Sequence, residues 1–295
     1  MSNPSDDVGA HASRHAASRG YWMVFVAALM WSLGGVLVKV LTKRHGVDPR
    51  AVACLRSAFG GLVLAWALPG LRQAPKVRVA AASVFYAIVV GTFVVATAGT
   101  TAANAILLQY AYPMFVAVGA VYLFKERLGG RTVAALALGM GGVATILVGS
   151  WRPGEQTGLV CGAVSAVTLA ALTLIQRSIR TGSAVAQSSF YNLVAAALLL
   201  PLAYGSLGVS AGALLLAALM GTVQLAVPYV LFIQGLRTVP ATDAALITIV
   251  EPILNPLWVW LVLAEVPHWS TGIGGALILA ALVVRFLGTS TRGST

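Results

Sequence analysis

The chain has 295 residues, of which 59% are hydrophobic and only 9% are charged. Soluble globular domains carry about 25% charged residues, so this composition excludes a soluble protein and indicates one that crosses a membrane several times. The formal net charge of +11 lies mostly between long apolar runs, so we interpret it as loop charge facing a cytoplasm and not as a nucleic-acid-binding surface.

Apolar segments follow one another from Tyr21 to Leu287. A helix needs about 20 apolar residues to cross a hydrocarbon core of about 30 Å. The sequence therefore predicts an all-α membrane protein with ten transmembrane helices, near residues 21–41, 50–69, 79–98, 101–124, 132–149, 157–177, 185–204, 211–235, 241–264 and 271–288. The polar stretch 1–19 has no apolar core with a cleavage site, so we expect a disordered cytoplasmic leader and not a signal peptide.

The Lys and Arg residues predict how these helices cross the membrane, because short cytoplasmic loops collect positive charge. If the N-terminus is cytoplasmic, most Lys and Arg residues fall on the inner side, and both termini, including the tail 289–295, lie inside. The outer side holds only Lys43, Arg44, Arg50 and Arg152. Lys39 and Arg56 fall near the outer ends of the first two segments, where we expect their long side chains to reach the headgroups. The predicted location is the bacterial inner membrane.

The second half of the chain repeats the first. Residues 243–265 (DAALITIVEPILNPLWVWLVLAE) match residues 104–126 (NAILLQYAYPMFVAVGAVYLFKE). The offset between the two copies is 139 residues. In both copies a Pro lies mid-segment (Pro113, Pro252) and a Glu follows 13 positions later (Glu126, Glu265). The repeats are predicted as 20–149 and 150–288. Because each has five segments, an odd number, the second enters the bilayer from the opposite side, which gives an inverted repeat typical of secondary transporters.

These features resemble one known family. Ten segments in two halves, each with the Pro and the Glu in its fourth segment, resemble the drug/metabolite transporter superfamily in its bacterial EamA-domain branch, over about residues 20–288. The stretch AANAILLQYAYPMFVAVGAVYLFKERL matches best, and the second copy is looser because Val266 and Pro267 follow Glu265. The resemblance implies an exporter of small organic metabolites or drugs that works by alternating access, and it does not fix the substrate.

Polar and aromatic residues near mid-span are the candidates for a substrate site. At a rise of 1.5 Å per residue, Glu251 and Tyr112 both lie about 15 Å into their segments. Helical spacing places Thr248, Glu251 and Asn255 on one face, opposite Gln109 and Tyr112. The substrate-binding candidates are Trp31, Tyr86, Gln109, Tyr112, Gln224, Thr248, Glu251 and Asn255. Trp31 and Tyr86 are included because segments one and three should line a central cavity in a protein that resembles this family.

Glu251 is the one carboxylate deep in an apolar run. A charge at the bilayer centre costs roughly 2.5–3.5 kcal/mol on insertion scales, so Glu251 is expected to face a cavity or a partner. Three roles remain open: binding a substrate ammonium, carrying a proton in antiport, or tying helices together as a neutral hydrogen-bonded acid.

Prolines and small residues predict hinges and close contacts. Pro113, Pro252 and Pro256 are the hinge candidates, because each proline frees a backbone carbonyl one turn upstream. Small residues at four-residue spacing, such as Ala137 and Gly141, predict that segments five and ten pack against each other. A monomer is favoured, and a homodimer is possible.

The sequence carries no catalytic, phosphate-binding or metal-binding motif, so no enzyme activity, cofactor or metal site is predicted. The expected partners are the lipid bilayer and a small-molecule substrate, without nucleic acid. We expect a secondary transporter that exports small amphipathic metabolites, most of all amino acids including aromatic ones. The alternatives are an exporter of cationic drugs or nucleotide-derived metabolites, and a non-transporting membrane module such as a lipid scramblase.

Overall fold

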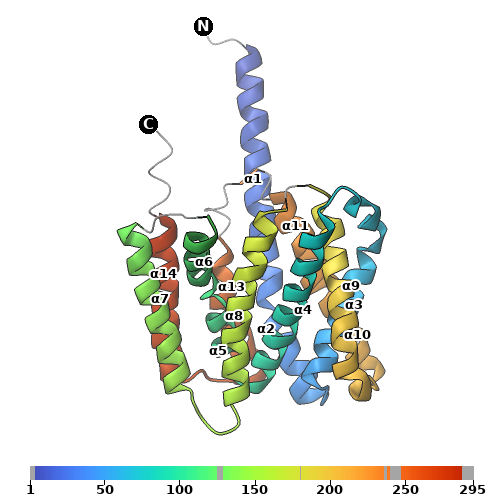
Figure 1. Ribbon diagram of the computed structural model, residues 1–295, viewed down its shortest axis with the longest axis vertical. Helices are drawn as coiled ribbons and strands as arrows, with labels where there is room; N and C mark the ends of the chain where they lie inside the picture. Colours follow the sequence, from blue (N-terminus) through green and yellow to red (C-terminus); the bar gives the residue numbers. More distant parts are fainter. Residues whose placement is uncertain (1–3, 125–128, 180, 236–237, 240–246, 288–295) are drawn as a thin grey trace.

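The computed structural model describes all residues except 1–3, 125–128, 180, 236–237, 240–246 and 288–295. Its described residues form helices joined by short links, as Figure 1 shows. The first half contains α1 (Pro4–Ser32), α2 (Gly34–Lys39), η1 (Val40–Arg44), α3 (Pro49–Val63), η2 (Ala65–Leu71), α4 (Lys76–Gly99), α5 (Ala102–Gln109), α6 (Tyr112–Phe124) and α7 (Gly130–Gly149). The second half contains α8 (Gln156–Arg177), α9 (Ala184–Ala203), η3 (Tyr204–Ser206), α10 (Ala211–Leu219), η4 (Met220–Ala226), α11 (Val227–Gly235), α13 (Val250–Leu263) and α14 (Trp269–Leu287).

The prediction of an all-helical protein with many membrane spans is confirmed, and each of the ten predicted segments contains helix. Within the described residues, six helices are long and apolar enough to cross a membrane alone. The pair α3 and η2, bent by 73°, makes a seventh if it is counted as one span. The fourth segment is divided into α5 and α6, and the ninth contributes the shorter helix α13. Fewer helices than segments are therefore long enough to cross a membrane alone, because the fourth segment is broken and the apolar stretches of α13 and α14, Val250–Leu263 and Trp269–Val284, are shorter.

Polar side chains set where several helices begin. Asp48 accepts a hydrogen bond from the Arg50 backbone N–H at 2.7 Å, and Pro49 follows it as the first residue of α3. Proline suits that position because its missing N–H would have no helical partner. Thr101, Ser183 and Ser210 cap α5, α9 and α10 in the same way. Hydrogen bonds from Arg50 hold the pKa of Asp48 below its usual value, so the cap on α3 stays ionised.

The leader differs from its expectation. The structure continues α1 back to Pro4, and this part of the helix extends beyond the rest of the molecule in Figure 1. The stretch SDDVGAHASRHAASR has a Pro at its start and several alanines. Alanine is the best helix former and proline is tolerated in the first turn, so the apolar helix can extend in this direction.

The two halves interlock. Besides a contact of α4 with α9, the main helix contacts pair α3 with α9, α7 with α14, α4 with α8, and α1 with α11. The first two pairs join equivalent segments of the repeats, the second segments and the fifth segments. The other two pairs are equivalent to each other under the repeat, because each joins the first segment of one half to the third segment of the other. A pseudo-two-fold axis relating the repeats requires this pattern of contacts.

The fifth segments α7 and α14 are in close backbone contact at Gly142 and Gly274. A Cβ on Gly142 would lie 2.5 Å from the Gly274 carbonyl oxygen, and a Cβ on Gly274 would lie 2.6 Å from that of Gly142. The predicted pairing of segments five and ten is therefore present, but the predicted face is wrong, since Ala137 and Gly141 are exposed. The buried face of α7 includes Gly139 and Gly142 instead.

At the end of the bundle opposite the start of α1, an ion pair joins the halves. Lys39 Nζ lies 2.8 Å from Glu265 Oε2 and donates a hydrogen bond to the Thr100 carbonyl oxygen at 2.6 Å. Glu265 Oε1 accepts a hydrogen bond from the Ala102 backbone N–H at 2.8 Å, and Lys43 Nζ lies 3.2 Å from Oε2. The prediction that Lys39 reaches the headgroups is wrong: its side chain is 2% exposed, because it turns inward to Glu265 and the Thr100 carbonyl oxygen.

Neutral side chains extend this contact. The Thr100 hydroxyl donates to Glu155 Oε2 at 2.6 Å and accepts from Asn104 Nδ2 at 3.0 Å. Thr271 Oγ1 donates to Asn104 Oδ1 at 2.6 Å. We call this set, Lys39, Thr100, Asn104, Glu155, Glu265 and Thr271, the polar end cluster. It ties α2, α5, the start of α8 and the α13–α14 link together. Glu126, the repeat partner of Glu265, lies outside the described residues.

The close contact between α7 and α14 predicts opposite effects for two neighbouring substitutions. Gly142→Ala should lower the thermal unfolding temperature of the purified protein, because its Cβ would meet a backbone oxygen, and overpacking costs about 1–3 kcal/mol. Gly141→Ala is the matched control, since nothing lies within 4 Å of its Cβ position. It should be neutral or stabilising, because alanine is favoured over glycine in a helix by about 1 kcal/mol. Equal effects at the two positions would contradict this packing.

The ion pair predicts that the two lysines near Glu265 differ in importance. Lys39→Met should destabilise the detergent-purified protein by about 3 kcal/mol, because it leaves a buried carboxylate without its closest cation. Lys43→Met, which removes a partner whose side chain is 54% exposed, should cost only about 0–1 kcal/mol. Thermal unfolding of both variants measures the difference, and the prediction fails if Lys43→Met is as damaging as Lys39→Met.

Candidate functional site

A cavity of about 380 Å³ lies in the middle of the bundle, between the two halves. Its lining includes Gln176 in the last turn of α8 and Phe232 in α11, so it extends toward the end where α1 begins and α14 ends (Figure 1). The polar end cluster lies at the other end. The lining residues are Trp31, Arg56, Tyr86, Val89, Val90, Phe93, Gln109, Tyr110, Tyr112, Leu169, Thr173, Gln176, Gln224, Leu225, Tyr229, Phe232, Thr248 and Glu251.

The cavity brings together most of the candidates named from the sequence. Seven of them line it: Trp31, Tyr86, Gln109, Tyr112, Gln224, Thr248 and Glu251. Asn255 does not. It is 1% exposed and packs against Gly35 of α2, where there is no room for a Cβ. Helical spacing placed Asn255 correctly one turn after Glu251, but α2 covers that part of α13. Neither polar atom of its amide has a hydrogen-bond partner among the described residues.

Glu251 is held by a tyrosine that the sequence did not single out. The Tyr110 hydroxyl lies 2.8 Å from Glu251 Oε2 and 2.9 Å from the Thr248 carbonyl oxygen. It therefore links the α5–α6 junction to α13. Tyr112, the repeat counterpart of Glu251, packs its ring edge-on against Tyr110 at 6.5 Å. Within the described part of the chain, Glu251 forms no ion pair, so its carboxylate lines the cavity with a neutral partner only.

Both copies of the fourth segment break just before the shared proline. α5 ends at Gln109 and α6 begins at Tyr112, whereas α13 begins at Val250 after a turn at Ile249. Pro113 and Pro252 therefore lie in the first turn of a new helix, where a missing N–H costs little. Pro256 lies inside α13. The breaks place Tyr110 and Glu251 beside the cavity, and the hinge role of the three prolines stays a prediction.

Aromatic rings form one wall of the cavity. Trp31 packs against Tyr229 with ring centroids 5.4 Å apart, and against Phe232 at 5.2 Å. Tyr86 contacts Tyr229 at 6.5 Å and donates a hydrogen bond to Asn192 Oδ1 at 2.9 Å. We call Trp31, Tyr86, Tyr229 and Phe232 the aromatic wall. It gives the cavity an apolar surface suited to a planar group.

Arg56 is another residue that sequence reasoning misplaced. The prediction that its side chain reaches the headgroups is wrong, since it is 5% exposed and lines the cavity. It lies two turns into α3, about 10 Å along the axis at 1.5 Å per residue, too deep for the surface to be the nearest polar region. Its Nε has no hydrogen-bond partner among the described residues. An Arg inside an apolar run is itself a signal of function.

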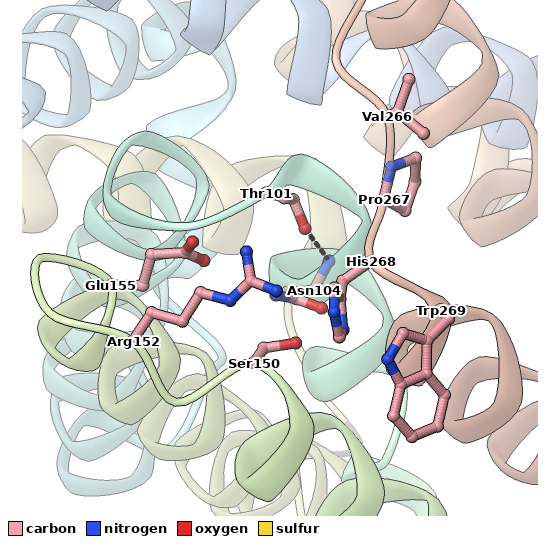
Figure 2. A pocket seen from close by; sticks show the side chains of 9 residues that line it. All are labelled: Thr101, Asn104, Ser150, Arg152, Glu155, Val266, Pro267, His268 and Trp269. Carbon is pink, nitrogen blue, oxygen red and sulfur yellow. Dashed lines mark hydrogen bonds between the residues drawn. The ribbon is translucent and has the colours of Figure 1, made fainter.

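A second, polar pocket of about 310 Å³ lies beside the polar end cluster (Figure 2). Arg152 extends across it from the α7–α8 link toward Asn104 and His268, and Trp269 lies at its edge. The His268 ring Nδ1 lies 2.9 Å from the Ser270 hydroxyl. Among the described residues, no group of three or more His, Cys, Asp or Glu could hold a metal ion. Along α5 and α13, this pocket lies at the end of Thr101 and Val266, and the central cavity lies at the end of Gln109 and Glu251.

Comparison with known proteins places this architecture in a family. Residues 18–148 and 156–287 each match the EamA-like transporter family. An uncharacterized transporter of Archaeoglobus fulgidus is 32% identical over 252 residues, which cover 84% of this chain and 90% of that protein. An uncharacterized transporter of Clostridium kluyveri is 22% identical over 289 residues, covering 91% and 93%.

A solved crystal structure shares the fold, with a TM-score of 0.66 at 21% identity over 94% of this chain and 98% of the other. The two family matches cover nearly the whole chain and coincide with its two interlocked halves. This chain belongs to the EamA-like transporter family and is a membrane transporter.

Proposed function

We propose that this transporter exports small amphipathic metabolites by alternating access, with amino acids, including aromatic ones, as its main cargo. The observation that carries the proposal is the central cavity, which both halves line with a carboxylate, an arginine, neutral polar groups and an aromatic wall. Binding sites of this kind combine apolar surface with a few polar groups that orient the ligand. A volume of about 380 Å³ falls in the range of small-molecule pockets, about 300–1,000 Å³.

The polar end cluster supports alternating access. Lys39 and Glu265 join the halves at the end away from the cavity's extension toward Gln176 and Phe232. In the proposal this cluster is the closed gate of the conformation described here. Transport to that side requires the ion pair to separate, and Lys43, already 3.2 Å from Glu265, keeps a cation near the carboxylate. A closed end and an extended cavity are the features of one half of an alternating-access cycle.

The proposed orientation places both termini in the cytoplasm of a bacterial cell and the polar end cluster on the outer side of the inner membrane. Two observations support it. The start of α1 and the end of α14 lie at the same end of the bundle (Figure 1). Of the described Lys and Arg residues, most belong to helix ends and links at that end, as the positive-inside rule requires of the cytoplasmic side.

A cationic compound is the second candidate cargo. Glu251 and the aromatic wall favour it, because carboxylates and aromatic faces together attract organic cations. Arg56 disfavours it, since a cation entering the same cavity meets a buried positive charge. Amino acids are preferred because they carry groups suited to both charges.

The proposal predicts saturable exchange that depends on Glu251. Proteoliposomes loaded with unlabelled phenylalanine should take up labelled phenylalanine, and Glu251→Gln should lower the rate about 10- to 100-fold, because it removes a charged hydrogen-bond acceptor from the cavity. Asp48→Asn is the matched control, since it makes the same carboxyl-to-amide change at an exposed helix cap where asparagine serves as well as aspartate. It should exchange at the unaltered rate.

The same vesicles distinguish the alternatives. Exchange of organic cations without exchange of amino acids would replace the main proposal with the second candidate. Protein-dependent movement of a fluorescent lipid reporter, with no saturable exchange of either solute, would identify a scramblase. Near-normal phenylalanine exchange by Glu251→Gln would leave Glu251 only the structural role of its bond to Tyr110.

A further inference from the structure

We propose that Arg56 is the carboxylate-binding residue of the central cavity, and that Arg56 and Glu251 together select zwitterionic α-amino acids over amines and carboxylic acids. This inference rests on the proposed function and deepens it, because it names the two groups that a substrate must carry. It assigns a specificity-determining role to a residue that the sequence pattern alone left at the membrane surface.

The first observation is that Arg56 is a buried cation without an anion. It is 5% exposed, and its Nε has no hydrogen-bond partner among the described residues. The ion pairs of the described residues join other groups, namely Lys39 and Lys43 with Glu265, and Arg50 with Asp48. An unpaired buried charge is strongly unfavourable. A guanidinium presents five N–H donors in a planar fork that matches a carboxylate, so a ligand carboxylate supplies what the protein does not.

The second observation is that Glu251 is in the reverse situation in the same cavity. Its described hydrogen-bond partner is the neutral Tyr110 hydroxyl, and no described cation pairs with it. Arg56 comes from α3 and Glu251 from α13, and both line the cavity without forming an ion pair with each other. The cavity therefore offers one site for an anion and a separate site for a cation.

Charge balance then decides between ligand classes. A molecule with both a carboxylate and an ammonium group neutralises Arg56 and Glu251 together. An amine leaves Arg56 unpaired, and a carboxylic acid leaves Glu251 unpaired. A buried polar group left without a partner is costly, so a site built to bind a group rejects the analogue that lacks it.

The aromatic wall supplies the third part of the site. Tyr86 and Tyr229 line the same cavity as Arg56, and Trp31 packs against Tyr229. An amino acid whose carboxylate binds Arg56 therefore has aromatic rings beside it for its side chain. This arrangement favours large apolar or aromatic side chains over small polar ones.

Three ligands with the same phenyl ring test the inference: phenylalanine, phenethylamine, which lacks the carboxylate, and 3-phenylpropionate, which lacks the ammonium group. Binding to the purified full-length protein is followed by calorimetry, and exchange is followed in proteoliposomes. The unaltered protein should bind phenylalanine at least about tenfold more tightly than either analogue. Arg56→Gln should remove the advantage of phenylalanine over phenethylamine, and Glu251→Gln should remove its advantage over 3-phenylpropionate.

Arg56→Lys keeps the charge and serves as the second variant. It should preserve the order of the three ligands with weaker phenylalanine binding, because lysine cannot form the two-pronged contact of arginine. Size-exclusion profiles and unfolding temperatures check that each variant is folded.

The outcomes separate this inference from the function on which it rests. Equal weakening of all three ligands by Arg56→Gln, while the unaltered protein exchanges phenylalanine, would overturn the role of Arg56 and leave the transport proposal standing. Tighter binding of phenethylamine than of phenylalanine by the unaltered protein would also overturn it. If the unaltered protein neither binds nor exchanges any of the three, the proposed function fails, and the inference fails with it.

Discussion

Buried charge is the constraint on which the rest of this structure depends. A charge in the low-dielectric interior of a membrane protein needs a partner or a polar cavity, and the described spans of this chain place Lys39, Arg56 and Glu251 there, with Glu265 at the end of one. Lys39 and Glu265 neutralise each other at 2.8 Å and join the two halves at one end. Arg56 and Glu251 line the central cavity and form no ion pair with any described residue. The first pair is thus suited to holding the halves together, and the second to receiving a ligand.

The duplicated architecture gives these charges their positions. Helices of one half pack mainly against helices of the other, with α7 against α14 and α3 against α9 as equivalent pairs. None of the described lining of the central cavity comes from the α7–α14 pair, and its glycine contact keeps it close-packed. It therefore serves as scaffold, while α1, α3, α4, α8, η4, α11 and the two broken fourth segments surround the site. The helix breaks beside Pro113 and Pro252 place the polar groups of Tyr110 and Glu251 at the cavity.

The sequence predicted the parts of this arrangement that follow from hydrophobicity and repetition. Apolar length located the ten segments, and the offset between the copies located the cavity, since most of the polar mid-span residues line it. The sequence-based prediction failed where the position of a side chain depended on contacts with other helices. Asn255 shares a face with Glu251 on a regular helix, but α2 covers it at Gly35. Tyr110 was not among the substrate-binding candidates, because helical spacing does not place it on one face with Gln109 and Tyr112, whereas the break after Gln109 brings it to Glu251. Lys39 and Arg56 were judged by distance to the headgroups, whereas a partner far along the chain or a cavity was nearer.

The backbone repeat is symmetric, but the two charges of the cavity are not repeated in the other half. The repeat gives Glu251 a neutral counterpart, Tyr112, and Arg56 belongs to the first half whereas Glu251 belongs to the second. Near Arg56, α3 passes close to the π-helix η4, where a Cβ on Gly60 would lie 3.0 Å from the Gly221 carbonyl oxygen, so the Arg is fixed at a contact between the halves. π-helical turns occur often at functional sites. A ligand that binds both charges therefore connects the two halves. Any motion that changes their separation changes the affinity for that ligand, and by reciprocity the ligand biases the motion. In this way two charges that have no ion-pair partner among the described residues link recognition of the cargo to its movement.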